Sequence, residues 1–355
     1  IDGRCVSVVL DDHDVTFGSA EKVQEAFKEI IEEYRPQCVF LVTTCVIEII
    51  GDDFDAISEG LSKLYGIPVL PVHTVHFKCE DHLPGLERTI TVCAEMMKSC
   101  DCENSVNLLG QRMGDFATTE LYAMLQKAGV KIGLQLPCGC SIDDIKNAAA
   151  AKVNIVVNDI ALPLAQKMQE KFGIPYVYFN KFVIPEKIYE AYKNLFVYLD
   201  LELPGELEGL YQNAREKIEK NKGELEGITY IYGNTPYAVF EMNCFLSSLG
   251  MVPQVIQTNR YTEADEPYAK EILQYTDPYV CKAANIAPLQ YVYDVLSPYL
   301  YLGHEFGNRL RQKGIAIVDS DRASGMLGFE VTGYLLQQLV KSVREAKEYR
   351  KELGL

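Results

Sequence analysis

The sequence predicts an α/β fold of three doubly wound, mainly parallel-sheet (Rossmann-like) domains around a cleft, with a long C-terminal helix. Three observations predict it: a recurring joint between helix and strand, a charged helical stretch at 205–227, and a long amphipathic pattern at 329–353. In each joint a helical pattern ends at a glycine, which can take the left-handed conformation that closes a helix, and a short apolar strand follows. The joints are SKLYGIPVLPV (62–72), QKAGVKIGLQL (126–136), EKFGIPYVYF (170–179), SSLGMVPQVI (247–256) and RQKGIAIVD (311–319). Repeated αβ units of this kind build parallel sheets.

The first domain is expected over residues 1–104. Its predicted elements are a strand in CVSVVL (5–10), a helix at 19–35, strands at 38–43 and 67–72, and a helix at 83–98. The polar stretch 99–104 leads out of it.

The second domain is expected over 105–204, with Pro163 in the first turn of one helix. Its predicted strands lie near 105–110, 130–136, 153–157 and 175–179. A solvated or domain-bridging helix at 205–227 leads to a third domain at 228–328, whose first strand is 228–233. The segment 329–355 forms the last helix, with a docked apolar half and a solvated charged end.

Composition excludes several classes of function. The formal net charge of −16 disfavours nucleic acid and anionic membranes as partners, and leaves solubility or a basic protein partner as its role. No apolar run reaches the ~20 residues of a spanning helix, and residues 1–10 are neither a signal peptide nor a targeting helix. They lack an initiator Met, so the natural beginning of the chain is expected to be missing. Eleven cysteines, an odd number, indicate thiols or metal ligands in a reducing cytoplasm.

Polar side chains at predicted strand ends are the candidate binding residues, because ligands of parallel sheets bind beyond the carboxyl ends of the strands. Cys45 lies at one such end, Asn158 and Asp159 at a second, and Asn234 and Thr235 at a third. Neither G-x-G-x-x-G nor G-x-x-x-x-G-K-[ST] occurs, so nothing supports nucleotide binding.

Other candidates have a structural interpretation that we favour. The segment PVHTVHFKCEDHLPG is ligand-like in composition but matches no standard zinc spacing, so a polar surface loop is the favoured interpretation of its residues His73, His76, Cys79, Glu80, Asp81 and His82. Cys38 and Cys93 fall in apolar patterns typical of core thiols. Asp52 and Asp53 are expected to cap a helix.

The segment 11–57 resembles component 1 proteins of the nitrogenase superfamily, most closely the β-type subunit of the molybdenum–iron protein. The matched features are an acidic residue before x-x-F-G, a helix, a strand ending in Thr-Thr-Cys, and then x-x-E-x-I-G-D-D. Weaker resemblance extends to the end of the chain.

The resemblance implies that Cys45 is a ligand of a [4Fe–4S]-type cluster shared at a subunit interface. The family's other cluster cysteines would lie upstream of IDGRCVSVVL, and Cys5 matches a β-type cysteine that is not a cluster ligand. Since such a cluster needs about four ligands, the recognised residues alone do not complete it.

The resemblance also implies that no iron–molybdenum type cofactor is held in the α-type manner. The positions of the α-type cysteine and histidine ligands fall near Asn158 and Ser320, and the nearest histidine in sequence is His304, a helix and a strand away. Amides and hydroxyls are poor substitutes for thiolate and imidazole on iron.

Three functions follow, of which we favour the first and keep the other two as alternatives. The first is a nitrogenase-like reductase that accepts electrons from an ATP-dependent iron–sulfur reductase protein and reduces a small or tetrapyrrole-like substrate. The second is a non-catalytic scaffold for metal-cofactor assembly, and the third is an α/β ligand-binding protein without a cluster. The first two imply a homodimer or a pairing with a homologous subunit.

Overall fold

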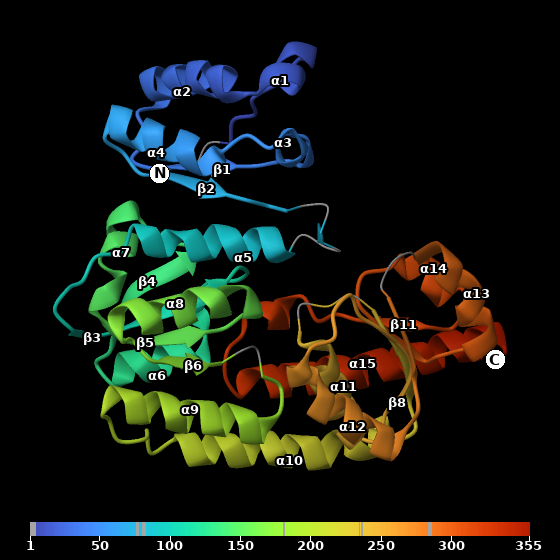
Figure 1. Ribbon diagram of the computed structural model, residues 1–355. Coiled ribbons are helices and arrows are strands. Elements are labelled where there is room, and N and C mark those ends of the chain that lie inside the picture. The colour runs from blue at the N-terminus through green and yellow to red at the C-terminus, as the bar shows by residue number, and fades with distance from the viewer. Residues whose placement is uncertain are drawn as a thin grey trace. The chain divides into compact units, whose positions relative to one another are not determined.

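The chain forms two compact units in a computed structural model that describes residues 5–75, 78–79, 83–179, 182–233, 235, 237–282 and 286–355. One unit contains Ile1–Gln111 and Val130–Tyr178, and the other contains Arg112–Gly129 and Phe179–Leu355. The described residues form three separate sheets, and the strands of each are parallel (Figure 1). The predicted α/β class with parallel sheets is thus confirmed. The predicted domain boundaries, and a cleft between domains, stay predictions.

The first unit alternates helices and strands. Its elements are α1 (Asp12–Phe17), α2 (Ala20–Tyr34), β1 (Val39–Val42), α3 (Cys45–Ile50), α4 (Phe54–Tyr65), β2 (Val69–Val72), α5 (Leu83–Val92), β3 (Glu103–Gln111), β4 (Lys131–Pro137), α7 (Ile142–Lys146), β5 (Ala151–Val156), α8 (Leu162–Phe172) and β6 (Tyr176–Tyr178), with 3-10 turns η2 (Cys93–Glu95), η4 (Ala148–Ala150) and η5 (Asp159–Ala161). Strands β1 and β2 form one sheet, and β4-β3-β5-β6 form another. Helix α5 packs on β2, α8 and η5.

The second unit holds the five-stranded sheet. Its elements are η3 (Phe116–Thr118), α6 (Glu120–Lys127), α9 (Pro185–Leu199), α10 (Leu207–Leu225), β7 (Thr229–Tyr232), α11 (Val239–Ser248), β8 (Val252–Gln257), η6 (Glu263–Asp265), α12 (Glu266–Tyr275), β9 (Tyr279–Cys281), α13 (Ile286–Leu296), β10 (Leu300–Leu302), α14 (Gly307–Arg311), β11 (Ala316–Val318), η7 (Arg322–Gly325) and α15 (Glu330–Leu353). Its strand order is β11-β10-β7-β8-β9, which reverses between β7 and β10 and so is doubly wound.

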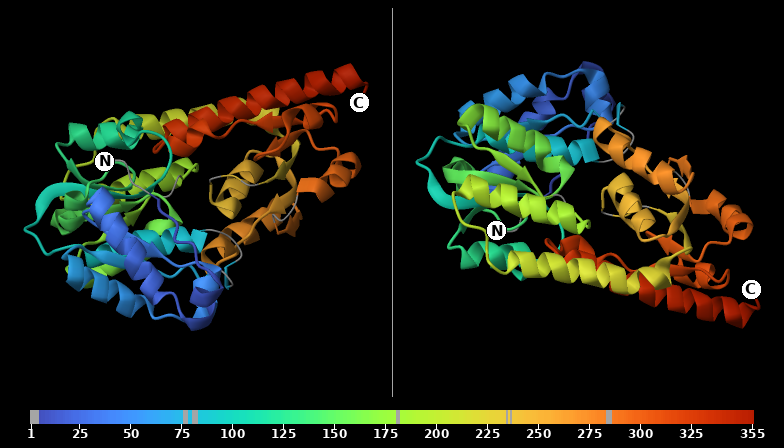
Figure 2. Two further views of the ribbon diagram at one scale, coloured as in Figure 1. Left: turned by 90° about the horizontal axis from the view of Figure 1, so that it is seen from above. Right: turned by 90° about the horizontal axis from the view of Figure 1, so that it is seen from below.

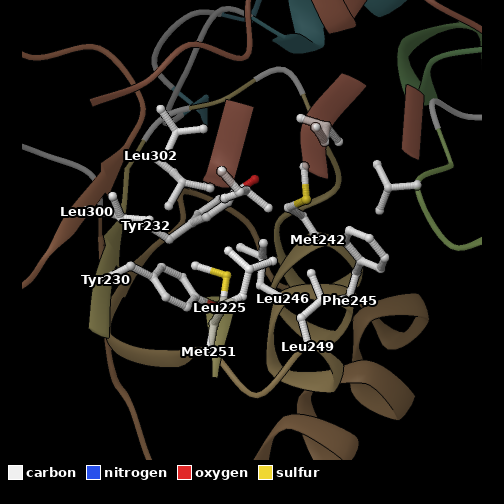
Figure 3. Close-up of a cluster of buried hydrophobic side chains, with 14 of the residues drawn as sticks. Leu225, Tyr230, Tyr232, Met242, Phe245, Leu246, Leu249, Met251, Leu300 and Leu302 are labelled. Carbon is white, nitrogen blue, oxygen red and sulfur yellow. The ribbon is translucent and has the colours of Figure 1, made fainter. Parts of the chain in front are cut away.

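Both faces of the five-stranded sheet are covered, because successive strand residues point to opposite sides. Tyr230 and Tyr232 enter a core formed with α11 and α15, together with Leu300 and Leu302 of β10 (Figure 3). Between them, Ile231 enters a second core formed with α13 and α14. Consecutive buried apolar residues in β7 and β10 are typical of strands with two covered faces.

The C-terminal helix α15 runs alongside α10, as Figures 1 and 2 show. Its N-terminal part buries Val331, Leu335, Leu336 and Leu339 in the core shared with β7 and α11, whereas its last residues are exposed. The predicted amphipathic helix with a docked half and a solvated end is confirmed.

The glycine joints behave as the sequence predicts. All five have a positive φ, namely Gly66 (70°), Gly129 (70°), Gly173 (75°), Gly250 (81°) and Gly314 (71°). Pro163 lies in the first turn of α8, also as predicted.

The predicted strand at 5–10 is wrong, because these residues adopt no regular structure. A strand needs a neighbour for its backbone hydrogen bonds, and the only pairing partner of β1 is β2 among the described residues. Val9 is 79% exposed, so the apolar run that suggests a strand is not a buried one.

Within the residues described, no helix combines the length and apolar character needed to cross a membrane.

Candidate functional site

Cys45 is the first residue of α3, immediately beyond the carboxyl end of β1. Thr43, the first residue after the strand, is buried, and Cys45 itself is half-buried. The predicted helix behind it also exists, since α4 begins at Phe54. Cys45 therefore lies at the carboxyl end of a parallel strand, the edge at which ligands of such sheets bind.

Glu48, one turn after Cys45, connects α3 to the end of β2. Its Oε1 atom accepts hydrogen bonds from the hydroxyl of Thr43 (2.8 Å), the hydroxyl of Thr74 (3.2 Å) and the backbone N–H of Val75 (2.5 Å). The N–H of Thr74 also donates to the Thr43 hydroxyl at 3.0 Å. The acidic residue of the x-x-E-x-I-G-D-D pattern thus holds two strand ends together, a role that the sequence analysis missed.

The segment after β2 keeps its histidine and cysteine in polar contacts. His73 Nε2 lies 3.2 Å from both carboxylate oxygens of Asp55, and the Cys79 thiol donates to the carbonyl of Val75 at 3.3 Å. These contacts agree with the favoured structural interpretation. His76, Glu80, Asp81 and His82 lie outside the described residues, so the alternative of a metal site there stays open.

Exposed apolar side chains occur on α3 and on two elements next to it, β1 and α1. Val42 at the end of β1 is 51% exposed, and Val46 and Ile49 of α3 are 42% and 70% exposed. Phe17, at 77% exposure, belongs to α1, which contacts α3. We call these four residues, Phe17, Val42, Val46 and Ile49, the Cys45 collar. Large exposed apolar side chains of this kind are candidates for an interaction surface.

The described residues do not complete the ligand set of an iron–sulfur cluster at Cys45. Among them, the only group of three candidate ligand atoms within 4.8 Å of one another is Asp11, His13 and Asp14. That group is exposed, and Asp11 and Asp14 form the capping box of α1. Cys5 is exposed outside any helix or strand. Among the residues described, Cys45 thus does not belong to a group of three candidate ligands.

Asn158 and Asp159 lie at the point where the order of the four-stranded sheet reverses, beyond the adjacent strands β3 and β5. The Asn158 side chain caps η5 by accepting from the N–H of Ile160 at 3.2 Å. Gly110, with φ 97°, lies so close that an added Cβ would be 2.9 Å from the Cβ of Asn158. Asp159 is exposed. The predicted strand-end location is correct for both residues, while Asn158 also has a structural role.

Thr235 lies at the corresponding reversal of the five-stranded sheet, beyond β7. Its hydroxyl pairs with that of Tyr232, and the N–H of Tyr237 donates to it at 3.4 Å. Burial raises the pKa of Tyr232, so this phenol stays neutral. Asn234 lies outside the described residues.

His304 is closer to Ser320 than its sequence position suggests. The two residues follow β10 and β11, which are adjacent and parallel, so their carboxyl ends meet. His304 Nε2 is 3.6 Å from Oδ1 of Asp321, the neighbour of Ser320. The pairing of β10 with β11 thus brings the imidazole of His304 next to the neighbour of Ser320, although in sequence it is a helix and a strand away.

Three further sequence assignments can be compared with the structure. Cys38 and Cys93 pack in one hydrophobic core, and burial raises their thiol pKa values to about 11 and about 12 respectively, which confirms them as core thiols. Asp53 caps α4 through the N–H of Ala56 at 2.9 Å, as predicted. Asp52 instead accepts from the N–H (2.7 Å) and hydroxyl (2.6 Å) of Ser19, at the start of α2.

Comparison with known proteins assigns the family. The family described as nitrogenase component 1 type oxidoreductase matches residues 1–344. A nitrogenase iron-molybdenum cofactor biosynthesis protein NifE of Rippkaea orientalis is 26% identical over 278 residues, which are 74% of this chain and 58% of that protein. The NifE protein of Clostridium pasteurianum is 32% identical over 176 residues, 48% of this chain and 38% of that protein.

Two other proteins are similar. The nitrogenase molybdenum-iron protein alpha chain of Methanosarcina barkeri is 25% identical over 70% of this chain and 48% of that protein. A solved structure described as "Nitrogenase Cp1 at pH 6.5" has a TM-score of 0.79 at 15% identity and covers 96% of this chain and 82% of its own, which shows a shared fold. The chain spans 58% of the NifE protein of R. orientalis and 38% of that of C. pasteurianum.

Proposed function

Because the chain belongs to the nitrogenase component 1 type oxidoreductase family, we propose that it is a cluster-binding subunit of a metal-cofactor assembly scaffold. Cys45 is one thiolate ligand of an iron–sulfur cluster, and a homologous subunit or a second copy of the chain covers the Cys45 collar. The observation that carries this proposal is the position of Cys45, which is half-buried at a helix start and has exposed apolar side chains on its own helix and on the neighbouring elements. A thiol of the core would not need such surroundings.

The scaffold role is favoured over substrate reduction for two reasons. Two of the relatives described above are named as cofactor biosynthesis proteins. In addition, the strand-end residue Asn158 offers an amide group, which binds a metal cluster less firmly than a thiolate does. Weak ligands suit a cargo that is later released.

Metal analysis of the full-length protein, made without oxygen together with its homologous subunit, tests the cluster. We expect iron and sulfide in the parent protein and a loss of most of the iron in Cys45→Ala, with an unchanged circular dichroism spectrum. Cys138→Ala is the matched control, because Cys138 is an exposed thiol of the same unit. Equal iron content in the parent protein and Cys45→Ala would show that Cys45 is not a ligand.

A transfer experiment separates the scaffold from a reductase. We expect the loaded protein to pass metal and sulfide to a cofactor-free acceptor of the same family. Multiple turnovers of substrate reduction with an ATP-dependent iron–sulfur reductase protein would instead support the second candidate, which the alpha-chain relative favours. A protein that carries no iron at all would favour a ligand-binding role without a cluster.

A further inference from the structure

We propose that Glu48 is the positioning residue of Cys45, because it fixes the start of α3 against the end of β2. The inference rests on the proposed function in that Cys45 is taken to be a metal ligand. It concerns a different property, namely where the thiol is held before any metal binds.

Apart from Glu48, helix α3 is held by Ile47 and Ile50 against a hydrophobic core and by its contact with α1. It contains six residues, fewer than a helix needs for stability of its own, and Ile47 is its only buried residue. Val46 and Ile49 point toward solvent, and the Thr44 side chain makes no capping hydrogen bond. The position of Cys45 at the first turn must therefore depend on a few specific contacts.

Glu48 makes the contacts that such a helix needs. Residues three apart share one face of a helix, so Glu48 lies on the same side of α3 as Cys45. Its Oε1 accepts from Thr43, just before the helix, and from Thr74 and Val75, just after β2. Hydrogen bonds to a carboxylate are about twice as strong as those between neutral groups. One oxygen atom thus connects the helix to both strand ends.

The segment after β2, which donates hydrogen bonds to Glu48, is itself held by further contacts. The guanidinium of Arg88 donates to the carbonyls of His73 (3.1 Å) and Thr74. The thiol of Cys79 donates to the carbonyl of Val75 at 3.3 Å. Val75 has a φ of 48°, a conformation that a β-branched residue adopts only when its surroundings impose it. Glu48 therefore anchors α3 to a fixed point rather than to a loose turn.

Two substitutions separate positioning from charge. Glu48→Gln keeps an oxygen that can accept from the same three donors, whereas Glu48→Ala removes it. The experiment measures the rate at which iodoacetamide modifies each cysteine of the metal-free, full-length protein, resolved by peptide mass spectrometry. We expect Glu48→Ala to raise the rate at Cys45 by about tenfold, because α3 opens locally more often. We expect Glu48→Gln to stay within about twofold of the parent protein, and Glu59→Ala, an exposed position on α4, to change nothing.

Two outcomes would overturn the inference. One is an unchanged rate at Cys45 in Glu48→Ala. The other is an equal acceleration at the buried Cys93 with a lower Tm, since that result would mean a general loss of stability. Iron analysis remains separate: if Cys45→Ala retains its iron, the proposed ligand role fails, while the alkylation rates still decide whether Glu48 positions the thiol.

Discussion

The cysteines of the first unit differ in their surroundings, and this difference predicts their reactivity. Burial raises the pKa of Cys93 to about 12 and that of Cys38 to about 11, so neither thiol ionises appreciably at pH 8. We expect both to react with iodoacetamide at least about a hundredfold more slowly than exposed Cys100 and Cys138, because the thiolate is the nucleophile. Site-resolved mass spectrometry of the folded protein measures this. Modification of Cys93 at the rate of Cys138 would contradict the assignment of Cys93 to the core.

Glu120 predicts a pH dependence of stability. Its pKa is raised above 4.5, mainly by burial and also by the nearby Glu330 carboxylate, although the N–H of Phe329 and the hydroxyl of Tyr192 donate to it. A raised carboxyl pKa means that the folded state binds the proton more tightly than the unfolded state. The contribution of Glu120 to stability therefore falls as pH rises from 4.5 through the folded pKa.

Glu120→Gln tests this dependence, because an amide keeps the acceptor and cannot ionise. We expect the free energy of unfolding to rise by roughly 1 kcal/mol at neutral pH, with the gain disappearing toward pH 4.5. Urea titrations of both proteins at a series of pH values provide the measurement. A gain that is the same at every pH would rule out ionisation of Glu120 as its cause.

At the residue scale the sequence predicted the roles of thiols and caps better than the role of Glu48. Cys38, Cys93 and Asp53 lie in local patterns that determine their surroundings. Glu48 depends on Thr74 and Val75, which approach it only because β1 and β2 pair. The available signal was a single carboxylate in the otherwise apolar stretch VIEII, a placement that calls for a partner.

Among the structural elements, two glycines of the first unit provide a matched test of backbone constraint. Gly173 has a φ of 75° and no atom within 4 Å of an added Cβ, so Gly173→Ala should cost about 1 kcal/mol from the left-handed backbone alone. Gly110 has a φ of 97°, and an added Cβ would also lie 2.9 Å from the Cβ and 3.0 Å from the N of Asn158. We expect Gly110→Ala to cost roughly 3 kcal/mol, measured by urea unfolding. Equal costs would mean that the turn at Asn158 moves freely.

The elements themselves were largely predictable, because helix–glycine–strand joints are local patterns. The incorrect prediction of a strand at 5–10 has a physical cause. The run CVSVVL has the apolar character of a strand, but strand formation depends on a neighbouring edge, which a local pattern does not contain. The start of α3 at Cys45 was missed for a related reason, since a six-residue helix held by Glu48 has too short a pattern to recognise.

At the scale of the whole molecule, the sequence predicted parallel sheets but not the order of their strands. The orders β4-β3-β5-β6 and β11-β10-β7-β8-β9 bring together strand ends that lie far apart in the chain. The short distance between His304 and Asp321 follows from such a strand order, and it could not be derived from their separation in sequence. An amide nevertheless occupies position 158, so we still expect no stoichiometric molybdenum or vanadium in the purified protein. Elemental analysis checks this, and either metal at a stoichiometric level would contradict it.

The last prediction concerns the assembly that the Cys45 collar implies. If a homologous subunit or a second copy covers Phe17, Val42, Val46 and Ile49, a charge at Ile49 would be buried without a partner, which strongly disfavours association. We expect Ile49→Glu to weaken association at least about tenfold in analytical ultracentrifugation, and to lower the iron content accordingly.

The Tm of the isolated chain should stay within a few degrees, because Ile49 is already exposed to solvent. Val197→Glu is the control, since Val197 is an exposed apolar residue on α9, in the other unit. If Ile49→Glu and Val197→Glu weaken association equally, net charge rather than the Cys45 collar governs association. Full association and iron content in Ile49→Glu would place the partner on another surface, and Cys45 would then have to find its remaining ligands without the contact proposed here.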